Sequence, residues 1–259
     1  ELNKKGVPVY SVSSIFRSNQ IFFRWYGKDY SKVLTKFEHL FVQNQTSKNL
    51  LAKLGVTNVT VVGDTRFDRV IDIYNDSQEL PLVATFKGDS TTLVVGSSWE
   101  PDEDIILKFV NDNPKLKLII APHVVSESRI NDIIAKLNCK SVRLTTADEK
   151  SVKEAGCLII DCYGLLSSIY RYGDISYVGG GFGVGIHNVL EAAVYGIPVI
   201  FGPNNKKFRE AQHLIENKGG FEINNSEEFN SLMHKFLSDV NALNEAGNAA
   251  GAYVKDNSG

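Results

Sequence analysis

Residues 173–203 read GDISYVGGGFGVGIHNVLEAAVYGIPVIFGP, and they indicate the fold class more clearly than any other stretch of the chain. The apolar run at 175–178 predicts a buried strand, and the glycines after it predict a loop. Residues 188–195 then predict a helix, and the apolar run at 198–201 predicts a second buried strand. A strand, loop, helix and strand in this order are typical of a parallel α/β unit.

The glycine loop at 179–185 is a candidate site for an anionic ligand. Glycines let a ligand approach the backbone, and the first N–H groups and the dipole of the following helix favour a phosphate. The stretch is not a Walker loop, because it lacks Gly-Lys-Ser/Thr, and its glycine spacing departs from the dinucleotide fingerprint. Glycines also form tight turns, so both interpretations stay open on the residues alone.

Three polar side chains stand at the start of the predicted helix. Asn188, followed three residues later by Glu191, fits a capping-box-like pair that satisfies backbone donors without any ligand. His187 precedes them and has two interpretations. It would contact a phosphate or a sugar carboxylate of a ligand, or it would have a structural role only. Function is therefore sought at this helix start.

The composition is that of an ordinary globular protein. The 259 residues are 43% hydrophobic and 22% charged, which is enough for two modest cores. A formal net charge of −2 argues against broad nonspecific nucleic-acid binding, which needs a cationic surface. Cys139, Cys157 and Cys162 have no Cys-x-x-Cys spacing, so we expect buried reduced thiols rather than a disulfide framework or a zinc site. No apolar run reaches the ~20 residues of a membrane span, and no signal peptide is recognised.

The chain begins ELNKKG, without an initiator Met. Residues 1–6 predict the last turn of a helix with a glycine stop, followed by a strand at 7–12. On this basis we expect a fragment whose preceding sequence is missing.

Predicted strands and helices alternate along the chain, which favours parallel sheets. Residues 1–80 are predicted to hold the remainder of one Rossmann-like domain plus linker, and the polar stretch at 74–89, broken by Pro81 and Gly88, is predicted to connect it to a second unit. Residues 81–259 are predicted to form a second domain. The predicted strands are 7–12, 40–43, 59–62, 92–95, 116–121, 141–144, 157–160, 175–178 and 199–201, and the predicted helices are 22–35, 47–54, 102–111, 127–137, 188–195, 208–217 and a region from 227.

Several polar loops fall where predicted strands end. In an open parallel sheet, ligands bind beyond the carboxyl ends of the strands. Ser97, His123 and Gly164 follow such ends, as does the glycine loop. Asp161 and His123 are candidates for acid or base chemistry, but no spacing of nucleophile and base supports a hydrolase triad.

The aromatic and basic stretch IFFRWYGK at 21–28 has two interpretations. One is a helix that packs its Phe and Trp side chains into the first domain. The other is a short amphipathic element at a membrane interface, because aromatics and cations share it.

The glycine-loop segment resembles the donor-nucleotide end of GT-B glycosyltransferases, and most closely the 3-deoxy-D-manno-octulosonic acid (Kdo) transferases of lipopolysaccharide synthesis. Taken together the motifs are specific for this family, and weaker motif matches extend over most of the chain. The main motifs are GGG at 179–181, HNVLE at 187–191, GIPV at 196–199, FGP at 201–203 and FRE at 208–210. The weaker ones are GVPV at 6–9, GDTRFD at 63–68, GSSWE at 96–100, APH at 121–123, and Asp161 with GLL at 164–166.

Two motifs depart from the family pattern. Where the family usually reads Gly-Ser-Thr-His, this chain has Trp99 in the histidine place. Where the family usually reads Arg-His-Pro after Ala-Pro, this chain has HVV at 123–125. The side-chain roles of these two loops are therefore not carried over from the family.

The resemblance implies an α/β fold of GT-B type, with two Rossmann-like parallel-sheet units, the first incomplete, and with residues 81–259 as the nucleotide-sugar (donor) binding domain. It also implies transfer of Kdo from CMP-Kdo to a lipid A precursor, with inversion and without a metal or other cofactor. The donor-binding residues that it implies are Gly180, Gly181, Phe182, His187, Asn188, Glu191, Ser97, His123, Gly164 and Glu210. Among these, Glu191 would grip the nucleotide ribose and Glu210 would reach the donor sugar.

The family's general base is a Glu of the amino-terminal domain, expected before Glu1, so the fragment alone is expected to be soluble and inactive. The full-length protein is expected at the cytoplasmic face of the bacterial inner membrane, with peripheral contact through the missing part or through residues 21–28. No nucleic acid is expected as a partner. Two alternatives stay open: another GT-B enzyme that uses a UDP-sugar, either a transferase or a 2-epimerase, and a nucleotide-binding fragment without turnover.

Overall fold

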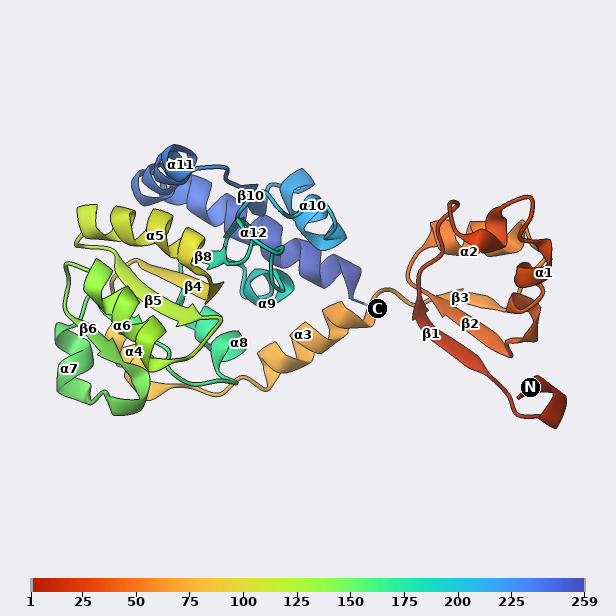
Figure 1. Cartoon of the computed structure of the whole chain (residues 1–259), viewed down its shortest axis with the longest axis horizontal. Helices are drawn as coiled ribbons and strands as arrows, with labels where there is room; N and C mark the ends of the chain where they lie inside the picture. The colour runs from red at the N-terminus through yellow and green to blue at the C-terminus, as the bar shows by residue number, and fades with distance from the viewer. Residues whose placement is uncertain (1, 259) are drawn as a thin grey trace. The chain divides into compact units, whose positions relative to one another are not determined.

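The computed structural model of the chain describes residues 2–258 (Figure 1). These residues form two compact units, each with its own sheet. One unit runs to Arg69 and takes in the last described residues from Asn257, and the other spans Val70–Asp256. Both sheets are parallel, so the predicted α/β class is confirmed.

The first unit is built on a three-stranded parallel sheet and one covering helix, namely β1 (Tyr10–Ser14), β2 (His39–Val42), β3 (Val59–Val61) and α2 (Gln45–Ala52). The strand order is β1-β2-β3, and α2 contacts both β2 and β3. Leu40, Val42 and Leu51 are fully buried in the core that these elements share. The first unit therefore has a hydrophobic core of its own.

The glycine stop predicted at residue 6 is confirmed. The 3-10 turn η1 (Asn3–Lys5) ends at Gly6, whose φ of 70° is left-handed and whose N–H bonds to the carbonyl of Asn3. Glu1, which the prediction included, lies outside the described residues.

The single helix predicted at 22–35 is wrong, because this segment is broken into η2 (Ile21–Phe23), α1 (Lys28–Ser31) and η3 (Leu34–Lys36). The rings of Phe22 and Phe23 pack edge-to-face on Phe16 at centroid distances of 6.3 and 6.2 Å, which holds the first turn in the core. Gly27 then packs so closely on the Ile21 carbonyl that no side chain fits there. Trp25 is 92% exposed. The core-packing interpretation therefore holds for the two phenylalanines and is wrong for Trp25.

The predicted polar link at 74–89 contains helical structure. α3 (Thr65–Asn75) runs into its first residues, and α4 (Pro81–Lys87) fills most of its second half. Pro81 is the first residue of α4, where a missing N–H costs no helical hydrogen bond, and Gly88, with φ 49°, ends the helix. The proline and the glycine are therefore helix boundaries rather than loop breakers.

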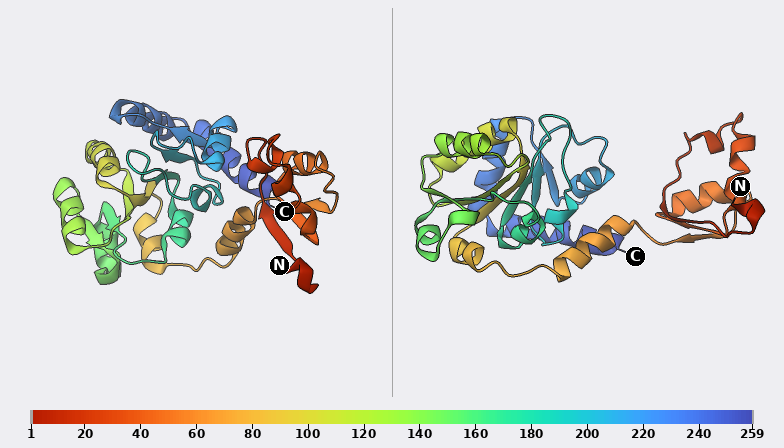
Figure 2. Two further views of the ribbon diagram at one scale, coloured as in Figure 1. Left: turned by 45° about the vertical axis from the view of Figure 1, so that its right-hand side comes forward. Right: turned by 60° about the horizontal axis from the view of Figure 1, so that its bottom comes forward.

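The second unit is built on a parallel sheet of β4 (Thr92–Ser98), β5 (Lys117–Pro122), β6 (Ser141–Arg143), β7 (Cys157–Ile159), β8 (Ile175–Val178), β9 (Val199–Phe201) and β10 (Gly220–Glu222). Helices lie on both sides of this sheet (Figure 2). They are α5 (Glu100–Asp112), α6 (Glu127–Lys136), α7 (Glu149–Glu154), α8 (Leu166–Ile169), α9 (Leu190–Ala193), α10 (Arg209–Glu216), α11 (Ser226–Ser238) and α12 (Val240–Asn257).

The order of the strands reverses beside β4. The sheet order is β10-β9-β8-β4-β5-β7-β6, so the chain first builds outward from β4 through β5. It then returns to the other side of β4 as β8 and builds outward in the opposite direction. In open α/β sheets, ligands bind in the crevice outside the carboxyl ends of the strands at such a reversal. The loops that follow β4, β5 and β8 are therefore the place to look for a site.

Two adjacent carboxylates are buried at the start of α5. Asp102 is 1% exposed and Glu103 is 0% exposed. One oxygen of Glu103 accepts a hydrogen bond from the Ser98 hydroxyl at 2.8 Å, and the other pairs with Arg129 of α6. Burial raises the pKa of Glu103, while the Ser98 bond and the Arg129 charge oppose that rise. Because a buried charge is costly unless it is paired, Arg129 makes the burial of Glu103 tolerable.

We predict that Arg129→Met destabilises the chain by about 3–5 kcal/mol near neutral pH, because it leaves the Glu103 carboxylate buried without its cation. Urea unfolding measures this cost. The pKa of folded Glu103 is already raised and should rise further in the variant. The folded variant then takes up a proton as the pH falls through that pKa, so the deficit should shrink on acidification.

The matched control is Lys153→Met, which removes an exposed ion pair with Glu149. It should cost less than ~1 kcal/mol. Equal costs for the two variants, or a deficit of Arg129→Met that grows as the pH falls, would contradict this role for Arg129.

Candidate functional site

Three strand ends meet where the strand order of the second unit reverses. Gly179, after β8, donates its N–H to the Gly96 carbonyl of β4 at 2.9 Å, and His123, after β5, donates its N–H to the Ser98 carbonyl at 3.0 Å. Between them, Ser97 has a φ of 53°, in the left-handed region, where the register between β4 and β5 shifts. Such a conformation costs energy in a residue other than glycine, and it is concentrated at functional sites.

The buried carboxylate of Asp102 joins two of these strand ends. One of its oxygens accepts the N–H groups of Trp99 and Gly180, each at 2.9 Å. The other accepts the hydroxyl of Tyr177 at 2.7 Å. Hydrogen bonds to an ionised acceptor are stronger than neutral ones, and this carboxylate receives three. Asp102 therefore fixes the start of the glycine loop relative to β8 and α5.

The glycine loop at 179–185 is folded back on itself. Gly183 and Gly185 donate their N–H groups to the Gly180 carbonyl at 3.0 and 3.1 Å, and His187 donates to the Gly179 carbonyl at 3.1 Å. Gly180 and Gly185 have φ values of 93° and 123°, which favour glycine at both places. Several amide groups of the loop are thus used to shape it.

The loop that follows β9 (Val199–Phe201) packs against the glycine loop and hydrogen-bonds to it. The Asn204 N–H donates to the Gly181 carbonyl at 2.8 Å, and its side-chain amide donates to the Gly183 carbonyl at 2.6 Å. Gly181 packs directly on the backbone of Gly202, and a Cβ added at Gly181 would lie 2.5 Å from the Gly202 nitrogen. Phe182 turns back toward the core of the second unit.

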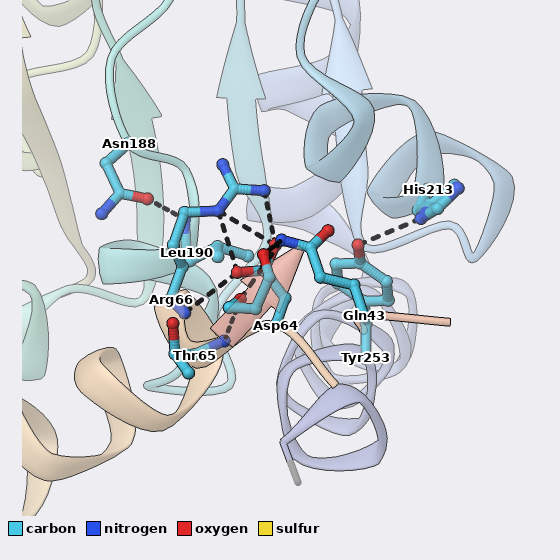
Figure 3. Close-up of polar contacts among 9 residues, drawn as sticks. Gln43, Asp64, Thr65, Arg66, Asn188, Leu190, His213 and Tyr253 are labelled. Atoms are coloured by element: carbon cyan, nitrogen blue, oxygen red, sulfur yellow. Dashed lines mark hydrogen bonds and ion pairs between the residues drawn. The ribbon is translucent and has the colours of Figure 1, made fainter. Parts of the chain in front are cut away.

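The helix after the glycine loop is shorter than predicted. The sequence predicts 188–195, whereas α9 contains four residues and the turn after it ends at Gly196, with φ 69°. Asn188 Oδ1 accepts the N–H of Leu190, two residues on (Figure 3). Its Nδ2 donates to Glu191 at 2.9 Å. This is an Asx turn with a side-chain pair, not a reciprocal capping box. So short a helix adds little dipole, which weakens the predicted attraction of an anion to its first turn.

Three aromatic rings from different loops meet beside the glycine loop. The His123 ring stacks on Trp99 at a centroid distance of 4.6 Å and on His187 at 4.5 Å. Nε1 of Trp99 donates a hydrogen bond to Nε2 of His187 at 3.2 Å. Burial lowers the pKa of His187, and neighbouring His123 lowers it further, against an opposite effect of Asp102.

The first sixty-nine residues match a known protein family. That family is described as 3-deoxy-D-manno-octulosonic-acid transferase (kdotransferase). The 3-deoxy-D-manno-octulosonic acid transferase of Rickettsia typhi is 24% identical over 87% of this chain. The chain is similar to the Kdo transferases. It spans about half the length of the Rickettsia protein, 50% of it being covered.

Solved structures show the same fold. The C-terminal CMP-Kdo binding domain of WaaA from Acinetobacter baumannii matches 73% of this chain and 97% of its own length, with 18% identity and a TM-score of 0.57. A putative UDP-N-acetylglucosamine 2-epimerase from Listeria monocytogenes matches 98% of this chain and 67% of its own length, with 14% identity and a TM-score of 0.63. The predicted GT-B type of fold is confirmed by these likenesses.

The two departures from the Kdo transferase motifs come together in space. Trp99 stands in the usual histidine place, and His123 stands where the family usually has arginine, yet the two rings stack on each other. Both also contact His187, which lies within the motif that the chain keeps. Sequence motifs taken separately do not reveal this contact, because the three residues are far apart in the chain.

The predicted donor-binding residues fall into three groups. Contacts bring Ser97, Gly180, Gly181, His123 and His187 together around the ends of β4, β5 and β8. The Asn188 and Glu191 pair follows directly on the glycine loop. Gly164 is exposed after β7 with φ 88°, and Glu210 is half-buried in the first turn of α10.

The sequence prediction misses Asp102 and Tyr177. Asp102 is the third residue of α5, and an acidic side chain there is a known partner for the backbone at the helix start. That signal identifies a cap but not the bond to Gly180. Tyr177 is predicted as part of a buried strand, and its hydroxyl partner comes from another element.

Asp161, a candidate for acid or base chemistry, is occupied by structure. Its carboxylate accepts the backbone N–H and the hydroxyl of Thr145 and pairs with Arg143 at 2.9 Å. Burial would raise the pKa of Asp161, but these bonds outweigh it and lower that pKa. Elsewhere in the chain, the Asp64 carboxylate accepts hydrogen bonds from Nε and Nη2 of Arg66 at 3.0 and 2.7 Å, after β3 (Figure 3).

Two further properties bear on the class of site. Across residues 2–258, no group of three or more His, Cys, Asp or Glu side chains is arranged to hold a metal ion. Within the same described range, no helix combines the length and the apolarity that crossing a membrane requires.

We predict that Gly181→Ala destabilises the second unit by about 1–3 kcal/mol, because the new methyl group would overlap the Gly202 backbone. Gly183→Ala is the control from the same loop, since its Cβ would have its nearest neighbour at 3.8 Å. The control should change the free energy of unfolding by less than ~0.5 kcal/mol. Denaturant unfolding of both variants measures the difference. Equal losses in the free energy of unfolding would contradict a close contact between Gly181 and the Gly202 backbone.

Proposed function

We propose that the second unit binds the nucleotide-sugar donor CMP-Kdo and that the protein transfers Kdo from it to a lipid A precursor in lipopolysaccharide biosynthesis, with inversion and without a metal. The observation that carries this proposal is the Asp102-held glycine loop at the strand-order reversal, in a chain related to Kdo transferases. The likeness to a CMP-Kdo binding domain supports the donor half of the proposal. Acceptor and stereochemistry rest on the family resemblance alone.

The glycine loop would receive the nucleotide phosphate. Gly180 and Gly181 carry no side chain, so a ligand can approach the backbone closely. His187 follows the loop and is only half-buried, which leaves part of its ring open to a ligand. Ser97 and His123, at the ends of β4 and β5, would line the same phosphate site. No residue of the chain is assigned as general base.

Glu191 would bind the nucleotide ribose. Its carboxylate accepts a hydrogen bond from Nδ2 of Asn188, which orients it beside the loop. A carboxylate is a strong acceptor for sugar hydroxyls. Glu210, half-buried at the start of α10, is proposed to reach the donor sugar, and Gly164 to line the site after β7.

Peripheral contact with the cytoplasmic face of the inner membrane is also part of the proposal. Trp25 and Tyr26 of the first unit are 92% and 59% exposed, and cationic Arg24 and Lys28 flank them. Exposed aromatic and basic side chains in one short segment suit a membrane interface.

The strongest alternative is a GT-B enzyme that acts on a UDP-sugar. A specific observation favours it, because the putative UDP-N-acetylglucosamine 2-epimerase covers nearly the whole chain in the structural comparison. At 14% identity that likeness concerns the fold only. Nucleotide preference therefore decides between the two.

We predict that CMP binds the chain in calorimetry with excess chelator, because loop amides and His187 can hold a phosphate without a metal. UDP should bind at least ~10-fold more weakly, which is about 1.4 kcal/mol. Tighter binding of UDP would favour the alternative, and loss of CMP binding in chelator with recovery in magnesium would overturn the metal-free site. Release of CMP from CMP-Kdo with a lipid A precursor separates a transferase from a binding module.

A second prediction concerns Glu191→Gln. The amide keeps the shape of the side chain, so the free energy of unfolding should change by less than ~1 kcal/mol. Loss of a charged acceptor for a ribose hydroxyl should weaken CMP by roughly 10- to 100-fold. Glu227→Gln, on the exposed start of α11, is the control and should leave both quantities unchanged. Parent-like affinity for CMP in Glu191→Gln would restrict Glu191 to a structural role.

A further inference from the structure

Trp99 and His187 are joined by a bond whose direction is fixed by chemistry. An indole N–H can only donate a hydrogen bond. At 3.2 Å from Nε1 of Trp99, Nε2 of His187 must therefore be the acceptor and carry no proton. A neutral ring of this kind has its proton on Nδ1, and an imidazolium, with protons on both nitrogens, would lose the bond.

The surroundings of His187 agree with a neutral ring. The titratable groups that face it are His123, stacked on it at 4.5 Å, and Asp102, whose carboxylate is already engaged by three donors. Burial and His123 both lower the pKa of His187, and Asp102 acts in the other direction without reversing the shift. Among the described residues, the bond from Trp99 is the ring's one polar contact of hydrogen-bond length.

The Asp102 carboxylate anchors the backbone on both sides of this hydrogen bond. Asp102 accepts the N–H of Trp99 and also that of Gly180, at the head of the loop that leads to His187. His123 stacks on both rings and restricts their tilt. The indole is thus held in place by the fold before any ligand arrives, as a preorganised supporting residue should be.

We propose that Trp99 is a positioning residue of the donor site, which holds His187 in the neutral tautomer with Nδ1 protonated, so that His187 meets the phosphate of the bound nucleoside monophosphate as an uncharged hydrogen-bond donor. This inference rests on the proposed function for its ligand, but the tautomer itself does not. It also explains what the unusual tryptophan does: it supplies a donor to His187 at a place where the family usually has a histidine.

The first test needs no ligand. In the parent chain, 1H–15N spectra of the imidazole nitrogens, with His187 assigned by the loss of its signals in His187→Gln, should show Nδ1 protonated and Nε2 unprotonated at neutral pH. A protonated Nε2, or a ring that is already imidazolium, would overturn the proposal. This outcome is independent of whether CMP binds, so failure of the proposed function and failure of the positioning role are distinguishable.

The second test uses Trp99→Phe, which keeps an aromatic side chain beside His123 but has a smaller ring and no indole N–H. The variant should lose the fixed tautomer, and CMP should bind roughly 3- to 10-fold more weakly at neutral pH, the size of one hydrogen bond. Cytidine, which lacks the phosphate, should bind parent and variant alike. Trp25→Phe, at an exposed position of the first unit, is the matched control and should behave as the parent.

The pH dependence gives a signature that a merely structural role would not. Without the Trp99 bond, His187 of the variant takes up a proton at higher pH than in the parent, and the cation attracts the phosphate. The ratio of parent to variant affinity for CMP should therefore fall as the pH is lowered, and titration of CMP itself cancels in that ratio. An unchanged tautomer, an unchanged affinity for CMP, or an equal loss for CMP and cytidine would each contradict the proposal.

Discussion

The buried carboxylate of Asp102 is the constraint on which the candidate site depends. A carboxylate that is 1% exposed is tolerated only when it is hydrogen-bonded, and here three donors bind it. Two of those donors are backbone groups of Trp99 and Gly180, and the third is the hydroxyl of Tyr177. Moving the glycine loop away from β8 or from α5 would leave the charge partly unpaired, at a cost of several kcal/mol. The loop conformation is therefore set before a ligand binds.

A rigid loop of this kind explains how the strand-order reversal becomes a site. Gly181 packs on Gly202, two loop carbonyls accept hydrogen bonds from Asn204, and the rings of Trp99, His123 and His187 stack beside the loop. Preorganised groups bind a ligand without a further loss of conformational entropy. The proposed donor site thus draws part of its order from Asp102 and Asn204, which are not themselves proposed to touch the donor.

Much of this architecture can be predicted from the sequence, because fully buried parallel strands are continuous apolar runs. β8 and β9 are found at 175–178 and 199–201, where the sequence predicts them. The remainder depends on contacts between distant segments. The bond from Tyr177 to Asp102 and the stack of His123 on Trp99 have no local signature, so neither can be predicted from a motif. β10 is three residues long and begins with glycine, which makes its signal too weak to recognise. The glycine loop is predicted as a ligand site, and this remains a prediction.

A crystal structure of the chain with CMP tests the central claim most directly. We expect the phosphate between the glycine loop and His187, with the ribose hydroxyls within hydrogen-bond distance of Glu191. The same crystals should show the Asp102 carboxylate still bonded to Gly180, since the loop is ordered in advance. A nucleotide bound away from the ends of β4 and β8, or no bound nucleotide at saturating CMP, would contradict the account.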